Sequence, residues 1–323
     1  MTIKQLEDIK YYDKNYDLCV KYILKEDKKT YLGEKINRVC RFCGRDKVSG
    51  ASFEKEAHAL SHLLGNNRLF SYYECDDCNQ KYAKFENDYA AYMKLYHCCL
   101  KVHGKNGVPS CKVWKSRIDA QEGNFEIKIF EDDPTLTTKI DEENKTLIIE
   151  SKRTYTPLHV YKALLKMALT ILPDDDFQLF KKALSFLNSD TALPTTKIPV
   201  FFRLYGQCAN AYGYVTTMVF KQTEQSTANI PPYWFVLAYN NICIQMPLFG
   251  CELDEKIDGM NIKLTPIPTP PDIERIPVIY NEWLDLSNSE QIKNEPISLS
   301  FQFEEMSSVD LSDSVEVDTT ANQ

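Results

Sequence analysis

The sequence predicts an α+β fold in two parts, followed by an acidic tail. Three observations predict it. Two C-x-x-C pairs lie at 40–43 and 75–78, apolar residues recur at helical spacing from Asp77 to about Leu100, and runs typical of strands occupy much of 198–247. The 323 residues are 43% hydrophobic, which is enough to fill sizeable cores.

The clearest domain boundary lies at 103–109, where HGKNGVP brings two glycines and a proline together. Before it, residues 3–12 and 15–26 have the pattern of short helices, so 1–35 is expected to be a helical lead-in. Residues 36–103 then form a module that contains both cysteine pairs and ends in the long amphipathic helix.

Residues 110–264 are expected to form a second, mixed α+β domain. NFEIKIFEDD and KTLIIES predict strands, and TPLHVYKALLKMALTIL and DDDFQLFKKALSFL predict a helix pair, with Pro157 near the first helical position and Asp174–Asp176 capping the second helix. Further strands are expected at 198–206, 211–220, 233–239 and 242–247. Asn240 and Asn241 lie between the last two, and Asn tolerates the left-handed backbone of a tight hairpin turn.

The end of the chain is expected to be a proline-containing linker and an acidic tail, over 265–323. Residues 301–323 contain six acidic residues and no Lys or Arg, a composition that favours disorder. No apolar run approaches the roughly 18 residues that span a bilayer, and the N-terminus lacks the apolar segment of a signal peptide. We therefore expect a cytoplasmic protein without a membrane partner.

Charge is unevenly distributed. Residues 1–117 carry 22 Lys and Arg against 15 Asp and Glu, a net of +7, and the remaining 206 residues carry 16 against 31, a net of −15. A basic N-terminal part is compatible with binding a polyanion such as nucleic acid, although solvated surfaces give similar imbalances. The acidic remainder predicts a different partner.

The strongest chemical signal is the pair of C-x-x-C motifs at Cys40, Cys43, Cys75 and Cys78. Eleven cysteines in a reducing compartment are unlikely to form disulfides, so regular spacing points to metal. Two such pairs supply the four thiolates of a tetrahedral structural zinc site. Four sulfur ligands leave no open position on the ion, so a reaction would need other groups.

Between and after these pairs, the sequence resembles the HNH endonuclease family, in its subgroup where two zinc knuckles bracket a ββα-metal fold. The matching pieces come in family order over residues 36–97: C40-R-F-C43, the strand ending in A57-H58, L64-G-N-N67, E74-C-D-D-C-N79 and the helix that follows. The resemblance covers under a third of the chain. It implies a metal-dependent nuclease that acts on DNA, with RNA not excluded.

The resemblance also implies roles for individual residues. His58 would be the general base that activates water, Asn66 or Asn67 would fix the loop and orient the histidine, and Asn79 would hold Mg²⁺ or another divalent ion on the scissile phosphate. An imidazole suits the first role because its ordinary pKa lies near neutrality. Asn79 alternatively caps the helix that begins nearby.

The chain departs from the family pattern at Ala57, where many members have an acidic residue or a second histidine. The catalytic-ion site is therefore one ligand short. Glu56 lies two residues from His58, on the same face of a strand, and His62 is another candidate ligand. The cations expected to touch phosphates, or simply to face solvent, are Arg41, Arg45, Arg68, Lys81 and Lys84.

Three functions remain open from the sequence. The first is an endonuclease in bacterial or phage-related defence or restriction, with the C-terminal domain recognising a target and restraining the nuclease. The second is a catalytically degenerate zinc module that binds nucleic acid or protein. The third is an effector nuclease controlled by a protein or ligand that binds the C-terminal domain.

Overall fold

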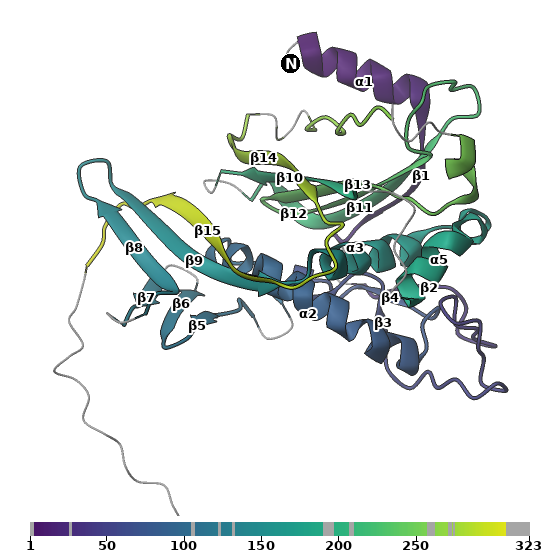
Figure 1. Cartoon of the computed structure of the whole chain (residues 1–323), viewed down its shortest axis with the longest axis horizontal. Coiled ribbons are helices and arrows are strands. Elements are labelled where there is room, and N and C mark those ends of the chain that lie inside the picture. Colours follow the sequence, from purple (N-terminus) through teal and green to yellow (C-terminus); the bar gives the residue numbers. More distant parts are fainter. Residues whose placement is uncertain are drawn as a thin grey trace, which may run out of the picture.

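The computed structural model describes residues 3–25, 28–104, 107–121, 124–130, 133–189, 197–206, 210–256, 262–270, 273 and 275–307. Its largest element is a six-stranded antiparallel sheet in the upper half of Figure 1. In spatial order its strands are β1 (Tyr16–Ile23), β11 (Tyr212–Gln222), β12 (Tyr233–Asn240), β13 (Ile242–Pro247), β10 (Pro199–Tyr205) and β14 (Val278–Asp285).

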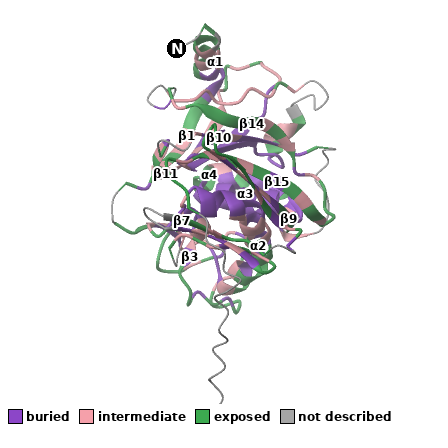
Figure 2. Ribbon diagram, turned by 90° about the vertical axis from the view of Figure 1, so that its left-hand side faces the viewer, coloured by how far each residue is buried: buried purple, intermediate pink, exposed green. Residues whose placement is uncertain are grey.

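The centre of the molecule is helix α3 (Pro157–Ile171), which lies between this sheet and helix α2 (Asp76–Cys99) (Figure 1). Every α3 residue except His159 is buried, and Figure 2 shows the helix as a buried block. A helix that is apolar on all sides must be covered on all sides. The predicted helices 77–100 and 157–171 are confirmed, and Pro157 occupies the first turn as expected.

The second helix of the predicted pair is broken into three pieces. These are α4 (Asp174–Phe177), a 3₁₀ turn at Gln178–Phe180 and α5 (Lys181–Asn188). The three aspartates lie inside the first turn of α4, and the N-cap position belongs to Pro173. Acidic side chains still stabilise that end of a helix through its dipole.

Two small sheets form the lobe at the left of Figure 1. One contains β15 (Ile292–Gln302), β9 (Thr146–Tyr155) and β8 (Leu136–Asp141), and the other contains β5 (Cys111–Val113), β6 (Ser116–Gln121) and β7 (Asn124–Lys128). The predicted hairpin at Asn240 is also present, because β12 and β13 pair directly and Asn240 has a φ of 49°.

The expected helix over 15–26 is wrong. Helix α1 spans Ile3–Asn15, and residues 16–23 then form β1, which pairs with β11 at the edge of the large sheet. The Tyr16 hydroxyl donates to the Pro231 carbonyl (2.9 Å) and accepts the indole N–H of Trp234 (2.8 Å). This tertiary pairing overrides a helical pattern in a segment rich in aromatic and β-branched residues.

The expected linker over 265–323 is also wrong in part, because it contains β14 and β15. Strand β14 pairs with β10, and β15 pairs with β9 over most of its length. Pro296 is compatible with β15 because this strand lies at a sheet edge, where its missing N–H breaks no ladder. The disorder predicted for 301–323 is wrong at its start, because Phe301 and Gln302 belong to β15, and residues 308–323 fall outside the described residues.

The hydrophobic core does not divide at 103–109. A single cluster of buried side chains includes Tyr82 and Phe85 from α2, Leu165 from α3 and Leu237 from β12. Residues 1–35 are split between the large sheet and β2 (Thr30–Leu32), which pairs with β4 (Leu69–Ser71). Among the described helices, none is long and apolar enough to cross a membrane.

Candidate metal centre and active site

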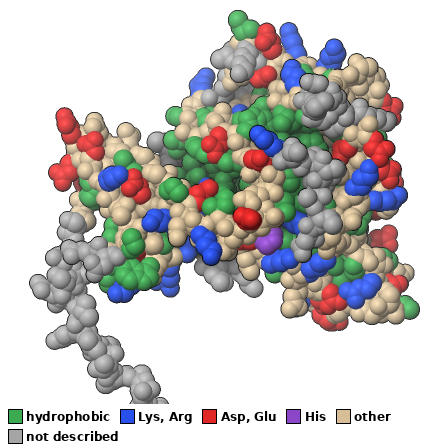
Figure 3. Space-filling model, in the orientation of Figure 1, with side chains coloured by type: hydrophobic (Ala, Val, Ile, Leu, Met, Phe, Trp, Pro, Cys, Tyr) green, Lys and Arg blue, Asp and Glu red, His purple; other side chains and the backbone are tan. Residues whose placement is uncertain are grey.

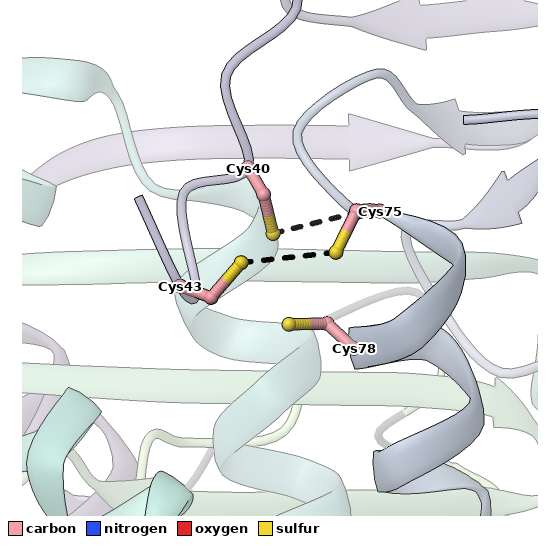
Figure 4. Close-up of side chains that lie close together, drawn as sticks. All are labelled: Cys40, Cys43, Cys75 and Cys78. Carbon is pink, nitrogen blue, oxygen red and sulfur yellow. Dashed lines mark hydrogen bonds between the residues drawn. The ribbon is translucent and has the colours of Figure 1, made fainter. Parts of the chain in front are cut away.

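The four cysteines of the two C-x-x-C pairs converge on one point (Figure 4). Cys40 and Cys43 lie on a tight turn that Gly44 closes with a φ of 71°. Cys75 is the N-cap residue of α2, and Cys78 lies in its first turn. A loop and a helix start, 32 residues apart in the sequence, therefore meet at the sulfurs.

The spacing of the sulfurs fits a tetrahedral metal ion. All four Sγ atoms lie within 4.8 Å of one another, and Cys43 and Cys75 Sγ are 3.7 Å apart. Zinc–sulfur bonds of about 2.3 Å at tetrahedral angles place neighbouring sulfurs about 3.8 Å apart. The donor set and its size both suit Zn²⁺.

The surroundings favour a thiolate at Cys40, whereas burial raises the pKa of Cys75 to about 11 and the hydrogen bond to Cys40 raises the pKa of Cys78. Cys40 Sγ accepts the N–H of Cys75 (3.4 Å), and hydrogen bonding from the Cys78 thiol lowers the pKa of Cys40 to about 5. Cys40, Cys75 and Cys78 are buried, whereas Cys43 is exposed. Four thiolates and Zn²⁺ carry a net charge of −2, and hydrogen-bond donors and nearby cations stabilise such a charge.

The strand with His58 is linked to the start of α2, where two of the cysteines lie. β3 (Ala57–His58) pairs antiparallel with β4, with His58 opposite Phe70, and α2 follows β4 in the chain. The Asp76 carboxylate, at the start of α2, accepts the backbone N–H groups of Glu54 (2.9 Å) and Lys55 (3.0 Å). The helix start therefore fixes the loop that leads into β3.

His58 is held as a neutral imidazole. Its ring stacks on His62, with centroids 4.4 Å apart, and contacts Phe70 at 4.7 Å. Burial, followed by the charges of His62 and Lys166, lowers the pKa of His58 to about 4. Within the described chain, its Nδ1 is buried without a hydrogen-bond partner. A neutral ring with an unpaired nitrogen can accept a proton or bind a metal ion.

A buried charge cluster, which sequence reasoning missed, lies under His58. Lys166 of α3 places its ammonium 2.8 Å from Glu74 and 3.8 Å from Glu86, and donates to the His58 carbonyl (3.3 Å). Burial opposes the charge on Lys166, but the two carboxylates outweigh it and the pKa of Lys166 is raised. The sequence signal was the lysine inside LLKMALTIL, since a charge in an apolar helix needs a buried partner.

Asn66 is placed to hold the loop between β3 and β4. Its side chain is fully buried, donates to the carbonyls of Leu60 (2.8 Å) and Leu69 (2.9 Å), and accepts the N–H of Leu69 (2.9 Å). Gly65, with a φ of 78°, is required beside it because a Cβ there would lie 2.6 Å from the His103 carbonyl oxygen. Asn67 is exposed. Among the hydrogen bonds of the described residues, none joins either amide to His58.

Asn79 lies in the first turn of α2, half-buried. It is not the helix cap, because Cys75 occupies that position, so the capping alternative is wrong. Its backbone N–H bonds to the Cys75 carbonyl (3.0 Å), and no side-chain hydrogen bond to it occurs among the described residues. Its amide is therefore not engaged in holding the fold.

The candidate ligands of a second ion do not come together. Glu56 is drawn away from His58, since its carboxylate accepts from Lys29 (3.0 Å) and from the Tyr31 hydroxyl. In the described part of the chain, the cysteine cluster is the one group of three or more His, Cys, Asp or Glu whose ligand atoms gather closely enough to hold a metal. His62 remains beside His58 but does not complete a set.

Of the five cations expected to face phosphates, Arg41 is a clear correction. Its side chain is 5% exposed, donates to the carbonyls of Leu169, Thr170 and Leu172 (2.9–3.1 Å) and pairs with Asp174. It therefore caps the C-terminal end of α3 and is not available to a phosphate.

The other four cations remain nearer the surface. Arg45 pairs with Asp77 (2.6 Å), and Arg68 donates to the Leu24 carbonyl (3.0 Å). Lys81 donates to the Asn188 carbonyl (2.9 Å), and Lys84 is exposed beside the Phe85 ring. Of these four side chains, Arg45, Arg68 and Lys81 bond to other parts of the protein, and Lys84 is the one best placed to contact a phosphate.

Comparisons with protein-family models, with curated proteins and with solved structures find no match. The resemblance to HNH endonucleases therefore depends on residues 36–97 of this chain alone. What the structure adds is a four-cysteine cluster that can bind zinc, within a mixed α+β fold.

Proposed function

We propose that the protein is a metal-dependent endonuclease that hydrolyses phosphodiester bonds of DNA. The observation that carries the proposal is His58, a neutral imidazole with an unpaired buried nitrogen. It lies on the edge strand β3 of the small sheet β2-β4-β3, and the helix that follows β4 begins at the four-cysteine cluster. This arrangement agrees with the residue order that resembles the HNH family. Zn²⁺ held by the four cysteines would be structural, because four thiolates leave it no open position.

In this proposal His58 accepts the proton of the attacking water. Its low pKa keeps it unprotonated at neutral pH, which a general base requires, at the cost of weaker basicity. Asn66 acts indirectly by fixing the loop between β3 and β4. Asn79 presents an amide oxygen from the helix start.

A catalytic divalent ion is part of the proposal, but the described residues do not form its ligand set. Glu56 is occupied by Lys29 and Tyr31, and His62 and Asn79 supply at most two ligands. We therefore derive no step through that ion. Its requirement is tested directly by adding metal.

The test is nicking of a supercoiled plasmid by the full-length protein with Mg²⁺, Mn²⁺ or Ni²⁺ added separately. We expect metal-dependent nicking that His58→Ala and Asn79→Ala abolish. His103→Ala is the matched control, since this histidine is exposed and lies outside the sheet β2-β4-β3. Zinc content is measured on each variant, so that loss of the fold is separated from loss of chemistry.

The second candidate is a zinc module that binds DNA or protein without cutting. Two observations favour it. The Glu56 carboxylate is paired with Lys29, and the described residues contain no second group of side chains close enough to bind a catalytic metal ion. DNA binding by a zinc-loaded protein that never nicks with any of the three ions would establish this reading over the nuclease.

The setting we propose is bacterial or phage-related defence or restriction, in which the C-terminal part recognises a target or regulates the nuclease.

The hydrophobic core shared by both parts of the chain limits what a truncated protein can show about such regulation. Helix α3 covers α2, and Arg41 is buried against the end of α3, so isolated residues 1–110 would expose a large apolar surface. Restraint is better tested in the full chain.

A further inference from the structure

A second candidate site lies far from His58, in a cavity between α2 and the left-hand lobe. Its volume is about 280 Å³, and α2, β5, β9 and β15 all contribute to its walls. Tyr92 on its wall is 13 residues beyond Asn79 along α2, or about 20 Å at a rise of 1.5 Å per residue. The cavity is therefore separate from the proposed active site.

The lining of this cavity is cationic. Lys94 from α2, Lys112 from β5 and Lys152 from β9 are among its lining residues, although they come from three distant segments of the chain. Among the described residues, no Asp or Glu lines it. None of these three ammonium groups has an ion pair among the described residues, whereas Arg153 beside them is neutralised by Glu295.

Part of the wall is built rigidly. The Arg153 guanidinium lies 3.9 Å from the centre of the Tyr92 ring, and Lys94 donates to the Lys112 carbonyl, so α2, β5 and β9 are tied together. These contacts hold three walls of the cavity together. The lining lysines give the cavity a positive charge that a bound anion would balance.

Neutral hydrogen-bond donors complete the lining. Thr135, Ser151 and Asn294 line the cavity, and the Thr135 hydroxyl donates to the Asp133 carboxylate. The pairing of β15 with β9 shifts register between Ile292 and Glu295, and Asn294 within that bulge has a φ of 56°. Its backbone N–H donates to the Thr154 hydroxyl (3.2 Å). A bulge of this kind re-aims a side chain, here at the cavity rim.

We propose that this cavity binds the phosphate groups of a small phosphorylated ligand, such as a nucleotide. Three lining lysines, together with the Ser151 hydroxyl and the Asn294 amide, suit phosphate oxygens. The volume lies just below the usual range of about 300–1,000 Å³ for small-molecule sites, which suits phosphate groups better than a whole large ligand.

A second hollow of about 410 Å³ leaves room for the rest of such a ligand. It shares Thr135, Ser151, Lys152 and Ile297 with the cavity and continues over β9 and β15. Its one lining acid among the described residues, Glu150, is paired with Lys139 (2.7 Å). Figure 3 shows Lys and Arg side chains scattered over the lobe that carries these strands. The inference does not depend on the proposed nuclease activity, because neither His58 nor Asn79 takes part in it.

The test is isothermal titration calorimetry of the full-length protein with ATP and with pyrophosphate, without added divalent ions. We expect binding that Lys112→Glu and Lys152→Glu each weaken at least tenfold. Lys128→Glu is the control, because Lys128 is an exposed lysine of the same lobe that does not line the cavity, and it should bind within twofold of the wild type. Circular dichroism verifies that each variant is folded.

Two results would overturn the inference. One is the absence of binding of either probe to the folded wild type. The other is equal binding by the two cavity variants and the control. A further arm uses a short DNA duplex: if Lys112→Glu and Lys152→Glu weaken duplex binding while ATP and pyrophosphate do not bind, the lysines contact a DNA backbone and the small-ligand site is wrong.

Discussion

The Lys166 ammonium lies 2.8 Å from the Glu74 carboxylate, and both side chains are at most 2% exposed. Lys166 belongs to α3, and Glu74 immediately precedes Cys75 of the metal centre. This ion pair therefore ties the central helix to the cysteine cluster and, through the His58 carbonyl, to the histidine strand. The candidate site is built from both parts of the chain.

Removing the charge of Lys166 should destabilise the protein strongly. In Lys166→Met the side chain keeps its length, but Glu74 remains buried without a counter-ion, a change that typically costs about 3–5 kcal/mol. Urea unfolding of the wild type and the variant measures the difference in free energy. Glu74→Gln combined with Lys166→Met should recover part of it, whereas an additive double variant would contradict the pairing.

Loss of one cysteine of the cluster should remove the zinc. We expect one zinc ion per wild-type chain and much less than one in Cys78→Ser, with a lower midpoint of thermal unfolding, because zinc binding contributes directly to folding. The readout is metal content by mass spectrometry. Cys19→Ser is the control, since Cys19 lies outside the cluster. Equal zinc content in both variants would contradict the assignment.

Arg41 should affect stability and not nucleic-acid binding. Arg41→Ala removes hydrogen bonds to three carbonyls at the end of α3, and bonds to a charged donor contribute about 1.5–3 kcal/mol each, so we expect a loss of at least about 2 kcal/mol. Lys84→Ala should leave stability unchanged. If the protein binds DNA as proposed, its affinity should fall in Lys84→Ala through a lost phosphate contact.

Acid should destabilise the protein through His97. This residue is fully buried against the Tyr239 hydroxyl (2.9 Å), and burial lowers the pKa of His97 to about 3. In the unfolded chain the pKa of His97 is about 6.5, so below that pH the unfolded state binds a proton and the folded state does not. The free energy of unfolding therefore decreases as the pH falls from about 6.5 towards 3. At pH 5 this amounts to about 2 kcal/mol relative to pH 7.

The check is urea unfolding of the wild type, His97→Gln and His103→Gln at pH 7 and pH 5. The loss on acidification should be smaller in His97→Gln than in the wild type, and His103→Gln should follow the wild type because that ring is exposed. An identical pH dependence in all three proteins would show that His97 is not the group responsible.

Local patterns were enough to predict the elements that depend on neighbouring residues. The cysteine cluster, α2, α3 and the hairpin at Asn240 follow from spacing, periodicity and turn chemistry. Tertiary pairing was beyond such patterns: β1 is a strand because β11 lies beside it, and β14 and β15 gain their partners more than 70 residues away.

The same limit applies to the site. Arg41 looked like a phosphate contact because nothing in its neighbourhood shows that the end of α3 lies over it. Glu56 was assigned to His58 from strand alternation, but Lys29 and Tyr31 compete for its carboxylate. Lys166 could have been suspected from its apolar surroundings, although its partner Glu74 could not.

The central claim is that His58 acts in phosphodiester hydrolysis, and a single-turnover cleavage rate tests it most directly. Wild type, His58→Ala and His103→Ala, each with its zinc bound, are compared on one plasmid at saturating Mg²⁺ or Mn²⁺. The account predicts a rate at least about 10²-fold lower in His58→Ala only, the usual contribution of a general base. Equal rates in all three proteins would contradict it.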